Sequence, residues 1–154
     1  MEFEVEYNKY KNDMYRLAYS YTLNRQDAED IIQKAFIQLY NNFDKFSDSE
    51  NIKHWLVVVT INQCKNLTIS HWKNKIFYPE NLEDYDTSYQ DNYTLIYSTI
   101  SKLKKSYRIP FYLNLIYGYT SKEIANIMGL TEGTIKMRIK RAKETLKLFW
   151  EENK

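Results

Sequence analysis

The side chains best placed to do chemistry in this sequence are five cations near its C-terminus. They follow one another at helical spacing and are Lys136, Arg138, Lys140, Arg141 and Lys143. Such a set binds phosphate oxygens and base edges, and binding of this kind needs no catalysis. The sequence shows no nucleophile paired with a base, no glycine-rich phosphate loop and no spaced carboxylate pair. These residues predict a binding protein that is not an enzyme and uses no cofactor.

The sequence does not support a metal-binding protein or a protein inserted in a membrane. Cys64 is the only cysteine, and His54 and His71 are far apart in the chain, so we predict no metal site. The first residues alternate acidic and apolar side chains and lack the basic start and apolar core of a signal peptide. No apolar run approaches the length of a membrane span. We therefore expect a cytoplasmic protein.

The five cations are predicted to lie on the second helix of a helix-turn-helix. Thr120 and Glu123 have the spacing of a capping box that starts the first helix. Gly129 can end that helix in a left-handed conformation, and Thr131 can cap the next one. The inner face of the second helix is predicted to comprise Ile135, Ile139, Ala142 and Leu146.

Apolar periodicity predicts three helices in the first half of the chain. The first covers about 8–22, and polar residues 24–26 separate it from the second. The second has a nearly continuous stripe of Ala28, Ile31, Ile32, Ala35, Phe36, Leu39, Tyr40 and Phe43. Residues 44–51 are polar and predicted to form a loop, and a third helix is expected from about Ile52. Val57 to Val59 alone would suggest a strand, but the spacing of their neighbours favours the helix.

Charge and pattern divide the chain into two parts. Residues 1–75 contain ten basic and ten acidic side chains. Residues 76–100 contain five acidic side chains and no basic one, and residues 101–154 contain twelve basic and five acidic ones. We predict helical modules at 1–76 and 95–154, joined by a flexible acidic linker at 77–94. The second module would open with a helix containing Ile96 and Ile100. A further helix should hold Phe111, Tyr112, Leu115 and Ile116, with Pro110 near its start.

Three segments resemble the extracytoplasmic-function (ECF) group of the bacterial sigma-70 family of RNA polymerase sigma factors. Residues 107–147 look like region 4 of that family, and residues 27–36 resemble its polymerase-binding helix in region 2. Trp55-Leu56, followed by residues 61–66, resembles the helix that approaches the melted promoter strand. The resemblance implies an all-α fold of a region 2 bundle and a region 4 helix-turn-helix. It also implies a sigma factor that directs RNA polymerase to promoters.

The resemblance implies three sets of binding residues. The first would dock on the clamp of core RNA polymerase and comprises Asp30, Gln33, Phe36 and Leu39. The second would capture a flipped base of the downstream promoter element and comprises Gln38, Phe46, Asn62 and Asn66. The third would meet the upstream element in the major groove and comprises Gly133, Thr134, Lys136, Met137, Lys140 and Arg141, with Arg138 and Lys143 on phosphates. The polymerase flap and an anti-sigma factor are the other expected partners of a protein that is monomeric when free.

The sequence also allows simpler explanations for some of these residues and for the chain as a whole. Phe36 and Leu39 also fit the core stripe of their helix, and Asn62 could be a hydrogen-bonded amide inside a bundle. The whole chain could be a helix-turn-helix regulator that does not recruit polymerase. It could also be a helical interaction protein whose basic face is only solvated.

Overall fold

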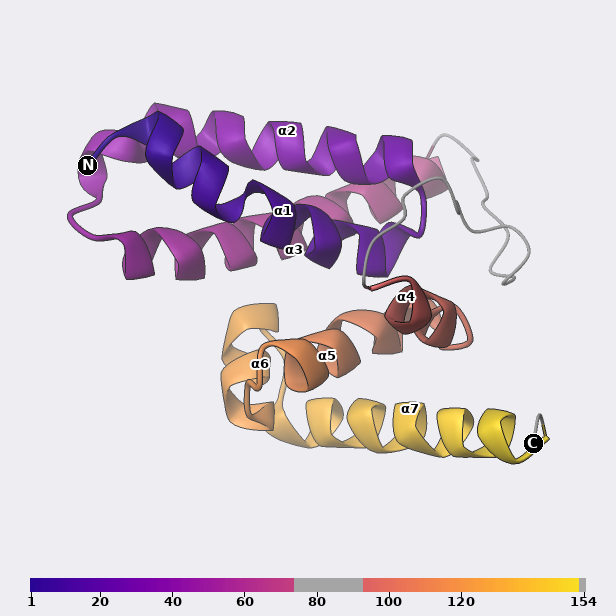
Figure 1. Ribbon diagram of the computed structural model, residues 1–154. Helices are drawn as coiled ribbons and strands as arrows, with labels where there is room; N and C mark the ends of the chain where they lie inside the picture. Colours follow the sequence, from indigo (N-terminus) through magenta and orange to yellow (C-terminus); the bar gives the residue numbers. More distant parts are fainter. Residues whose placement is uncertain (74–92, 153–154) are drawn as a thin grey trace. The chain divides into compact units, whose positions relative to one another are not determined.

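The computed structural model describes residues 1–73 and 93–152, and every regular element in those two ranges is a helix. The predicted all-α class is confirmed. The chain divides into two compact units, Met1–Tyr78 and Pro79–Lys154 (Figure 1). The predicted linker at 77–94 lies outside the described residues except for Tyr93 and Thr94, and Thr94 already begins a helix.

The first unit is a bundle of three long helices. They are α1 (Phe3–Thr22), α2 (Arg25–Asn42) and α3 (Ser49–Lys73), with a short 3-10 helix, η1 (Phe43–Lys45), after α2. Each of the three long helices packs against the other two (Figure 1). The largest fully buried side chains of this bundle are Met14, Leu17, Tyr19, Ile31, Leu39, Ile52, Leu56 and Ile61.

The break between α1 and α2 occurs where the polar residues predicted it. Leu23 ends α1 in the left-handed conformation, with φ 49°, and its N–H donates to the Tyr19 carbonyl. Asn24 then caps α2 because its side chain accepts a hydrogen bond from the Asp27 N–H at 2.9 Å. A left-handed residue followed by a cap turns the chain sharply, so the two helices can pack side by side.

Helix α1 begins earlier than predicted, at Phe3 instead of about residue 8. The alternation of acidic and apolar residues at the N-terminus hides its helical period. Phe3 and Tyr7 are one turn apart and stack with ring centroids 6.1 Å apart. Phe3 also meets Tyr40 and Phe43 edge-on, so contacts between helices decide the conformation of this segment.

Helix α3 also begins earlier than predicted, at Ser49 instead of Ile52. Asp48 caps it, accepting a hydrogen bond from the Asn51 N–H at 2.9 Å. The predicted loop at 44–51 is therefore shorter, and η1 occupies its start. The helical prediction for Val57 to Val59 is confirmed.

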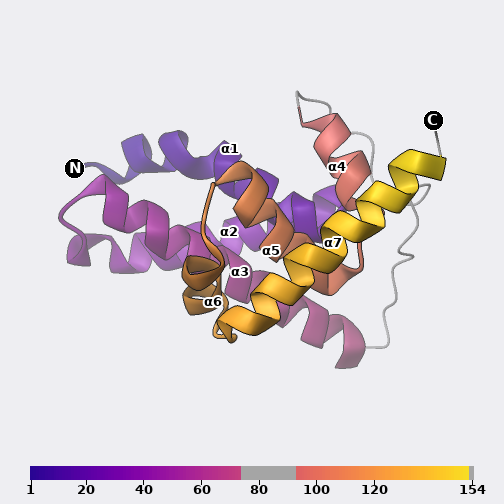
Figure 2. The same cartoon turned by 90° about the horizontal axis from the view of Figure 1, so that it is seen from below.

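The described part of the second unit, residues 93–152, holds four helices. They are α4 (Thr94–Ile100), α5 (Lys105–Ile116), α6 (Ser121–Met128) and α7 (Glu132–Glu152). Helices α5 and α6 pack against α7 and against each other (Figure 2). The core of this unit includes Tyr97, Ile100, Leu103, Tyr112, Leu113, Ile124, Ile135 and Ala142.

Two details of α5 correct the sequence prediction. Pro110 is an interior residue of a helix that begins at Lys105, and it is not close to the start. Proline has no N–H for the Ser106 carbonyl, but Ser106 is exposed, so water can replace the missing donor. Leu115 is 55% exposed, and Leu113 takes the core position instead. The proline had suggested a later start and so a different apolar face.

The helix-turn-helix has the predicted caps. The Glu123 N–H donates to Thr120 Oγ1 at 3.1 Å, and the Thr120 N–H donates back to Glu123 Oε1 at 3.4 Å. Gly129 ends α6 with φ 68°, and the Thr134 N–H donates to Thr131 Oγ1 at 3.2 Å. Ile135, Ile139, Ala142 and Leu146 are all buried, as predicted. These contacts fix the angle at which α7 leaves the turn.

Replacing Gly129 by alanine should destabilise the protein. A Cβ at Gly129 would meet nothing within 4 Å, so only its left-handed backbone opposes a side chain. We expect Gly129→Ala to lower the free energy of unfolding by about 1 kcal/mol in urea denaturation followed by circular dichroism.

Gly133 provides a matched control for this substitution. It also has open space at the Cβ position, but it lies inside α7 in ordinary helical conformation. Gly133→Ala should raise stability by up to about 1 kcal/mol because alanine is the better helix former. Equal effects of the two substitutions would contradict the role given to the left-handed turn.

Candidate functional site

The orientation of α7 decides which of its side chains can meet a partner. Its buried face packs on the rest of the unit. With 3.6 residues per turn, positions 133, 137 and 141 lie on the opposite face. Gly133 and Arg141 are exposed, and Met137 is 39% exposed. This outward face combines a small residue, an apolar residue and a guanidinium group.

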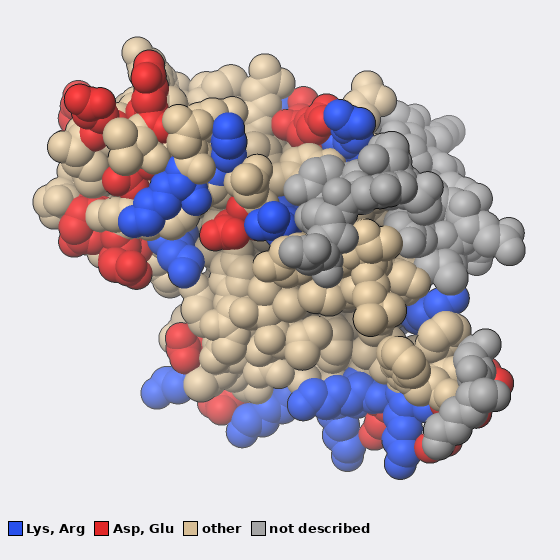
Figure 3. Space-filling view, in the orientation of Figure 1, with Lys and Arg blue, Asp and Glu red and all other residues tan. Residues whose placement is uncertain are grey.

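A row of lysines runs along one flank of α7. Lys136, Lys140, Lys143 and Lys147 line a shallow groove of about 390 Å³, together with Ser121, Ile139 and Glu144. Figure 3 shows basic side chains gathered over this helix. Lys136 also pairs with Glu132 one turn earlier, at 3.2 Å. Lys147 was not among the predicted residues, although its four-residue step from Lys143 could have indicated it.

Thr134 and Arg138 occupy the other flank of α7. Both are partly exposed. The Thr134 hydroxyl lies 2.8 Å from the Thr131 hydroxyl, and its backbone N–H is used in the cap. Thr134 therefore serves the helix start, and Arg138 is the cation on this side.

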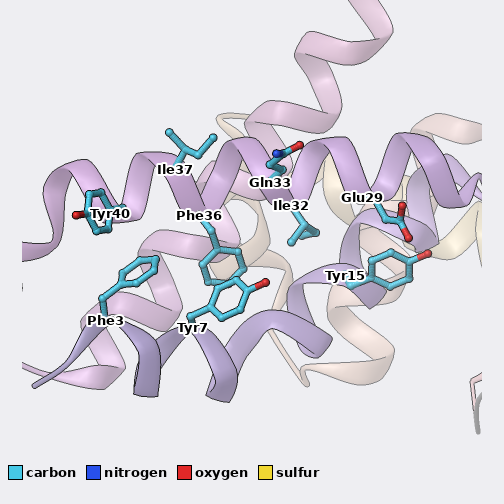
Figure 4. A pocket seen from close by; sticks show the side chains of 9 residues that line it. All are labelled: Phe3, Tyr7, Tyr15, Glu29, Ile32, Gln33, Phe36, Ile37 and Tyr40. Carbon is cyan, nitrogen blue, oxygen red and sulfur yellow. The ribbon is translucent and has the colours of Figure 1, made fainter.

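A second surface lies between α1 and α2. It is a groove of about 480 Å³ lined by Phe3, Tyr7, Tyr15, Glu29, Ile32, Gln33, Phe36, Ile37 and Tyr40. Figure 4 shows Phe3, Tyr7 and Phe36 turned toward one another between the two helices. The Tyr7 and Phe36 rings meet nearly at right angles, with centroids 4.9 Å apart.

Ile37 and Tyr40 add exposed apolar side chains to the lining of this groove. They are 54% and 67% exposed. Contiguous exposed apolar side chains rimmed by polar ones are typical of protein-binding sites. The apolar pattern of the sequence did not indicate Ile37, and it placed Tyr40 in the stripe of this helix. Ile37 lies next to the stripe, and an isoleucine in that position could have been noticed.

The four residues expected to dock on polymerase have unequal exposure. Leu39 is 0% exposed and belongs to the core, and Phe36 is 5% exposed at the floor of the groove. Gln33 is exposed and lines the groove. Asp30 is partly exposed, pairs with Lys34 at 3.1 Å, and lines with Gln33 a polar cleft that also holds Gln26, Asp27 and Glu29.

Of the four residues expected to meet the downstream element, two lie on α3, one precedes α3 and one lies on α2. Asn62 and Asn66 are exposed and one turn apart on α3, so the alternative of a buried Asn62 amide is wrong. Phe46 packs edge-on against Trp55 with ring centroids 5.5 Å apart. Gln38 is partly exposed on α2, and its carbonyl accepts a hydrogen bond from Asn42.

Comparison with known proteins identifies the family. Residues 7–74 match the family model for sigma-70 region 2, and residues 93–146 match the one for sigma-70 region 4. The chain belongs to the sigma-70 family. The two regions of this sigma factor correspond to the two compact units.

Individual relatives place the sigma factor in the ECF group. It is 26% identical over 141 residues to the RNA polymerase sigma factor SigV of Bacillus subtilis, covering 90% of this chain and 85% of that protein. It is 29% identical to the ECF sigma factor SigW of the same organism, covering 90% and 83%. The sigma factor RpoE of Bartonella quintana, solved with the anti-sigma factor NepR, has a similar fold, with a TM-score of 0.75 and 20% identity over 97% of this chain and 96% of that one.

Membership of this group establishes the general activity. The protein is a sigma factor that binds core RNA polymerase and directs transcription initiation from specific promoters. Sigma factors are initiation factors and not enzymes. Among the described residues no helix is long and apolar enough to cross a membrane, and no three His, Cys, Asp or Glu side chains gather as metal ligands.

Proposed function

We propose that region 2 docks on the polymerase clamp through the groove between α1 and α2. The observation that carries this proposal is the exposed pair Ile37 and Tyr40 beside Gln33, on the helix assigned to polymerase binding by resemblance. An apolar centre with a polar rim suits the docking of a helix. Gln33 belongs to that rim, Asp30 lies in the polar cleft that adjoins it, Phe36 forms the floor, and Leu39 belongs to the buried core of the bundle.

The proposed downstream-element site combines α3 with the segment before it. Asn62 and Asn66 present amide groups, which can pair with a base edge through two hydrogen bonds. Phe46, held against Trp55, offers a ring on which a flipped base could stack. Gln38 would contribute a further amide from α2.

The proposed upstream-element site is α7. Its outward face would enter the major groove, with the lysine row on one flank and Arg138 on the other meeting phosphates. Region 4 would also contact the polymerase flap, as the family resemblance implies.

We further propose regulation by an anti-sigma factor. RpoE of Bartonella quintana was solved with the anti-sigma factor NepR. CnrH, which matches this chain with a TM-score of 0.66 at 20% identity, was solved with the cytosolic domain of CnrY. In this proposal the free sigma factor is monomeric, catalyses no reaction itself and acts in the cytoplasm, where promoter DNA lies.

The decisive experiment is run-off transcription with purified core RNA polymerase and a library of genomic promoter fragments. The sigma factor should copurify with core polymerase and start transcripts from a subset of fragments. A regulator that only binds DNA would retain the fragments without copurifying with core polymerase. A helical interaction protein would do neither.

The proposed division at 1–76 and 95–154 predicts that each part folds alone. Each fragment buries its own core among its own helices. Both fragments should give helical circular dichroism spectra and unfold cooperatively on heating. A fragment that unfolds without a transition would show that its stability depends on the other part.

A further inference from the structure

A group of mostly part-buried polar contacts joins the start of α1 to the start of α3. Ser49, the first residue of α3, donates from its hydroxyl to Glu6 Oε2 at 2.6 Å. The Tyr10 hydroxyl donates to the Ser49 carbonyl at 2.9 Å and lies 2.6 Å from Ser49 Oγ. Lys9 Nζ donates to Ser49 Oγ at 2.9 Å. Glu6 is only 6% exposed and Tyr10 only 4%.

These contacts are not needed to start α3. Asp48 already caps that helix through the Asn51 N–H. The side-chain bonds at Ser49 reach residues about 40 positions away in the chain, all on α1. A buried carboxylate is costly unless it is hydrogen-bonded, so the Glu6 contact resists separation of the two helices. The arrangement therefore fixes α1 relative to the segment that precedes α3.

The other end of that segment rests on the same part of α1. Phe3 meets Phe43, the first residue of η1, edge-on with ring centroids 5.6 Å apart. Between the two anchors the Phe46 N–H donates to the Phe43 carbonyl at 3.2 Å. The first two turns of α1 thus hold the segment 43–49 at both ends, and Phe46 lies inside it.

We propose that Phe3, Glu6, Lys9 and Tyr10 form an N-terminal clasp that positions Phe46 and so sets base preference in the downstream element. The four are positioning residues and do not touch DNA. The inference rests on the proposed downstream-element site, because it assigns to the clasp a role in the selectivity of that site. Loosening one anchor should leave the pocket present but less discriminating.

The test uses the full chain with core RNA polymerase. Promoters carry one fixed upstream element and a downstream element randomised at each position, and transcript yields give the preference for each base. Ser49→Ala should reduce the best-to-worst base ratio at the captured position by about fivefold, the lower end of what one base contact discriminates. Ser49→Thr keeps a hydroxyl and should restore most of the ratio.

Ser20→Ala is the matched control. Ser20 is also in the first unit and fully buried, but its hydroxyl bonds only to the Leu17 carbonyl in α1, at 2.6 Å. It should reproduce a loss of thermal stability without flattening the base preference. Tyr10→Phe removes one oxygen atom and should act like Ser49→Ala, which decides the matter if Ser49→Ala fails to fold.

The outcomes separate this inference from the proposed function. Unchanged preference in Ser49→Ala and Tyr10→Phe, or equal flattening by Ser20→Ala, would overturn the clasp and leave the downstream-element site standing. Wild-type protein that shows no base preference in the downstream element would remove that site and the clasp together.

Discussion

Replacing Ile37 and Tyr40 together by alanine should weaken binding to core RNA polymerase by at least about 2 kcal/mol, or roughly thirtyfold in Kd. The physical reason is that both side chains are more than half exposed in the free protein and border the α1–α2 groove. Their burial on docking would be lost, while all buried core side chains of the bundle are kept and only the edge-on contact of Tyr40 with Phe3 is removed. Binding to core polymerase is measured without DNA, by fluorescence anisotropy of labelled sigma factor.

Ile69→Ala is the control for the apolar half of this prediction. Ile69 is 53% exposed in the same unit, against 54% for Ile37, but it lies on α3 away from the groove. It should leave the affinity within about 0.5 kcal/mol of wild type. An equal loss from Ile69→Ala would show that exposed apolar area in general, and not the groove, governs binding.

The polar residues beside the groove, Asp30 and Gln33, can be tested in the same assay. Asp30→Lys combined with Gln33→Ala should also lower core binding while leaving helicity unchanged. Asp13→Lys is the control for charge reversal because Asp13 is exposed and pairs with Arg16 within α1, as Asp30 pairs with Lys34 within α2. Unaltered affinity in the Asp30 and Gln33 variant would remove both residues from the docking surface.

Local sequence signals predicted the helix-turn-helix of the second unit best. Thr120, Glu123, Gly129 and Thr131 act on backbone groups within a few residues, so their types and spacing specify the helix-turn-helix directly. The caps of both helices and the turn between them lie at the predicted residues. The buried face of α7 was predicted equally well, because it consists of four apolar residues at strongly periodic positions.

Contacts between distant parts of the chain explain what the sequence could not predict. The start of α1 is helical because Phe3 packs on Tyr40 and Phe43, which no local pattern reveals. Asp48 caps α3 locally, but the bonds from Ser49 at its start reach α1, about 40 positions away, and no local pattern reveals them. Both features belong to the segment around the proposed downstream-element site, so the least predictable part of the first unit is also the part that bears on selectivity.

The periodic pattern of α2 also failed to predict how exposed the side chains at its edge are. The stripe on α2 correctly placed Ala28, Ile31 and Leu39 in the core, but Tyr40 at its edge is exposed. A stripe fixes the centre of a buried face and leaves its borders open, because the neighbouring helix covers only part of the circumference. The exposed apolar lining of the docking groove, Ile37 and Tyr40, lies on that border.

Arg141→Ala should change which upstream elements this sigma factor uses, whereas Lys143→Ala should weaken all of them alike. Arg141 lies on the outward face of α7 with Met137, opposite the buried face. On that face a side chain can reach base edges, where one good contact discriminates by about 1–3 kcal/mol. Lys143 lies in the flanking lysine row, where we propose that cations meet phosphates; its removal should therefore lower the salt slope of binding by about one unit.

Lys136 makes the comparison sharp because the sequence predicts a base contact for it, whereas its position beside the other lysines favours a phosphate contact. Its place near the front of the helix suggested a base contact. In the structure it lines the same groove as Lys140 and Lys143, and it is already paired with Glu132. We therefore expect Lys136→Ala to behave like Lys143→Ala. The assay is transcription from a randomised upstream element at two salt concentrations, so that ranking and salt slope are measured together. A changed ranking for Lys136→Ala with an unchanged one for Arg141→Ala would mean that α7 enters the groove by its lysine flank and not by its outward face.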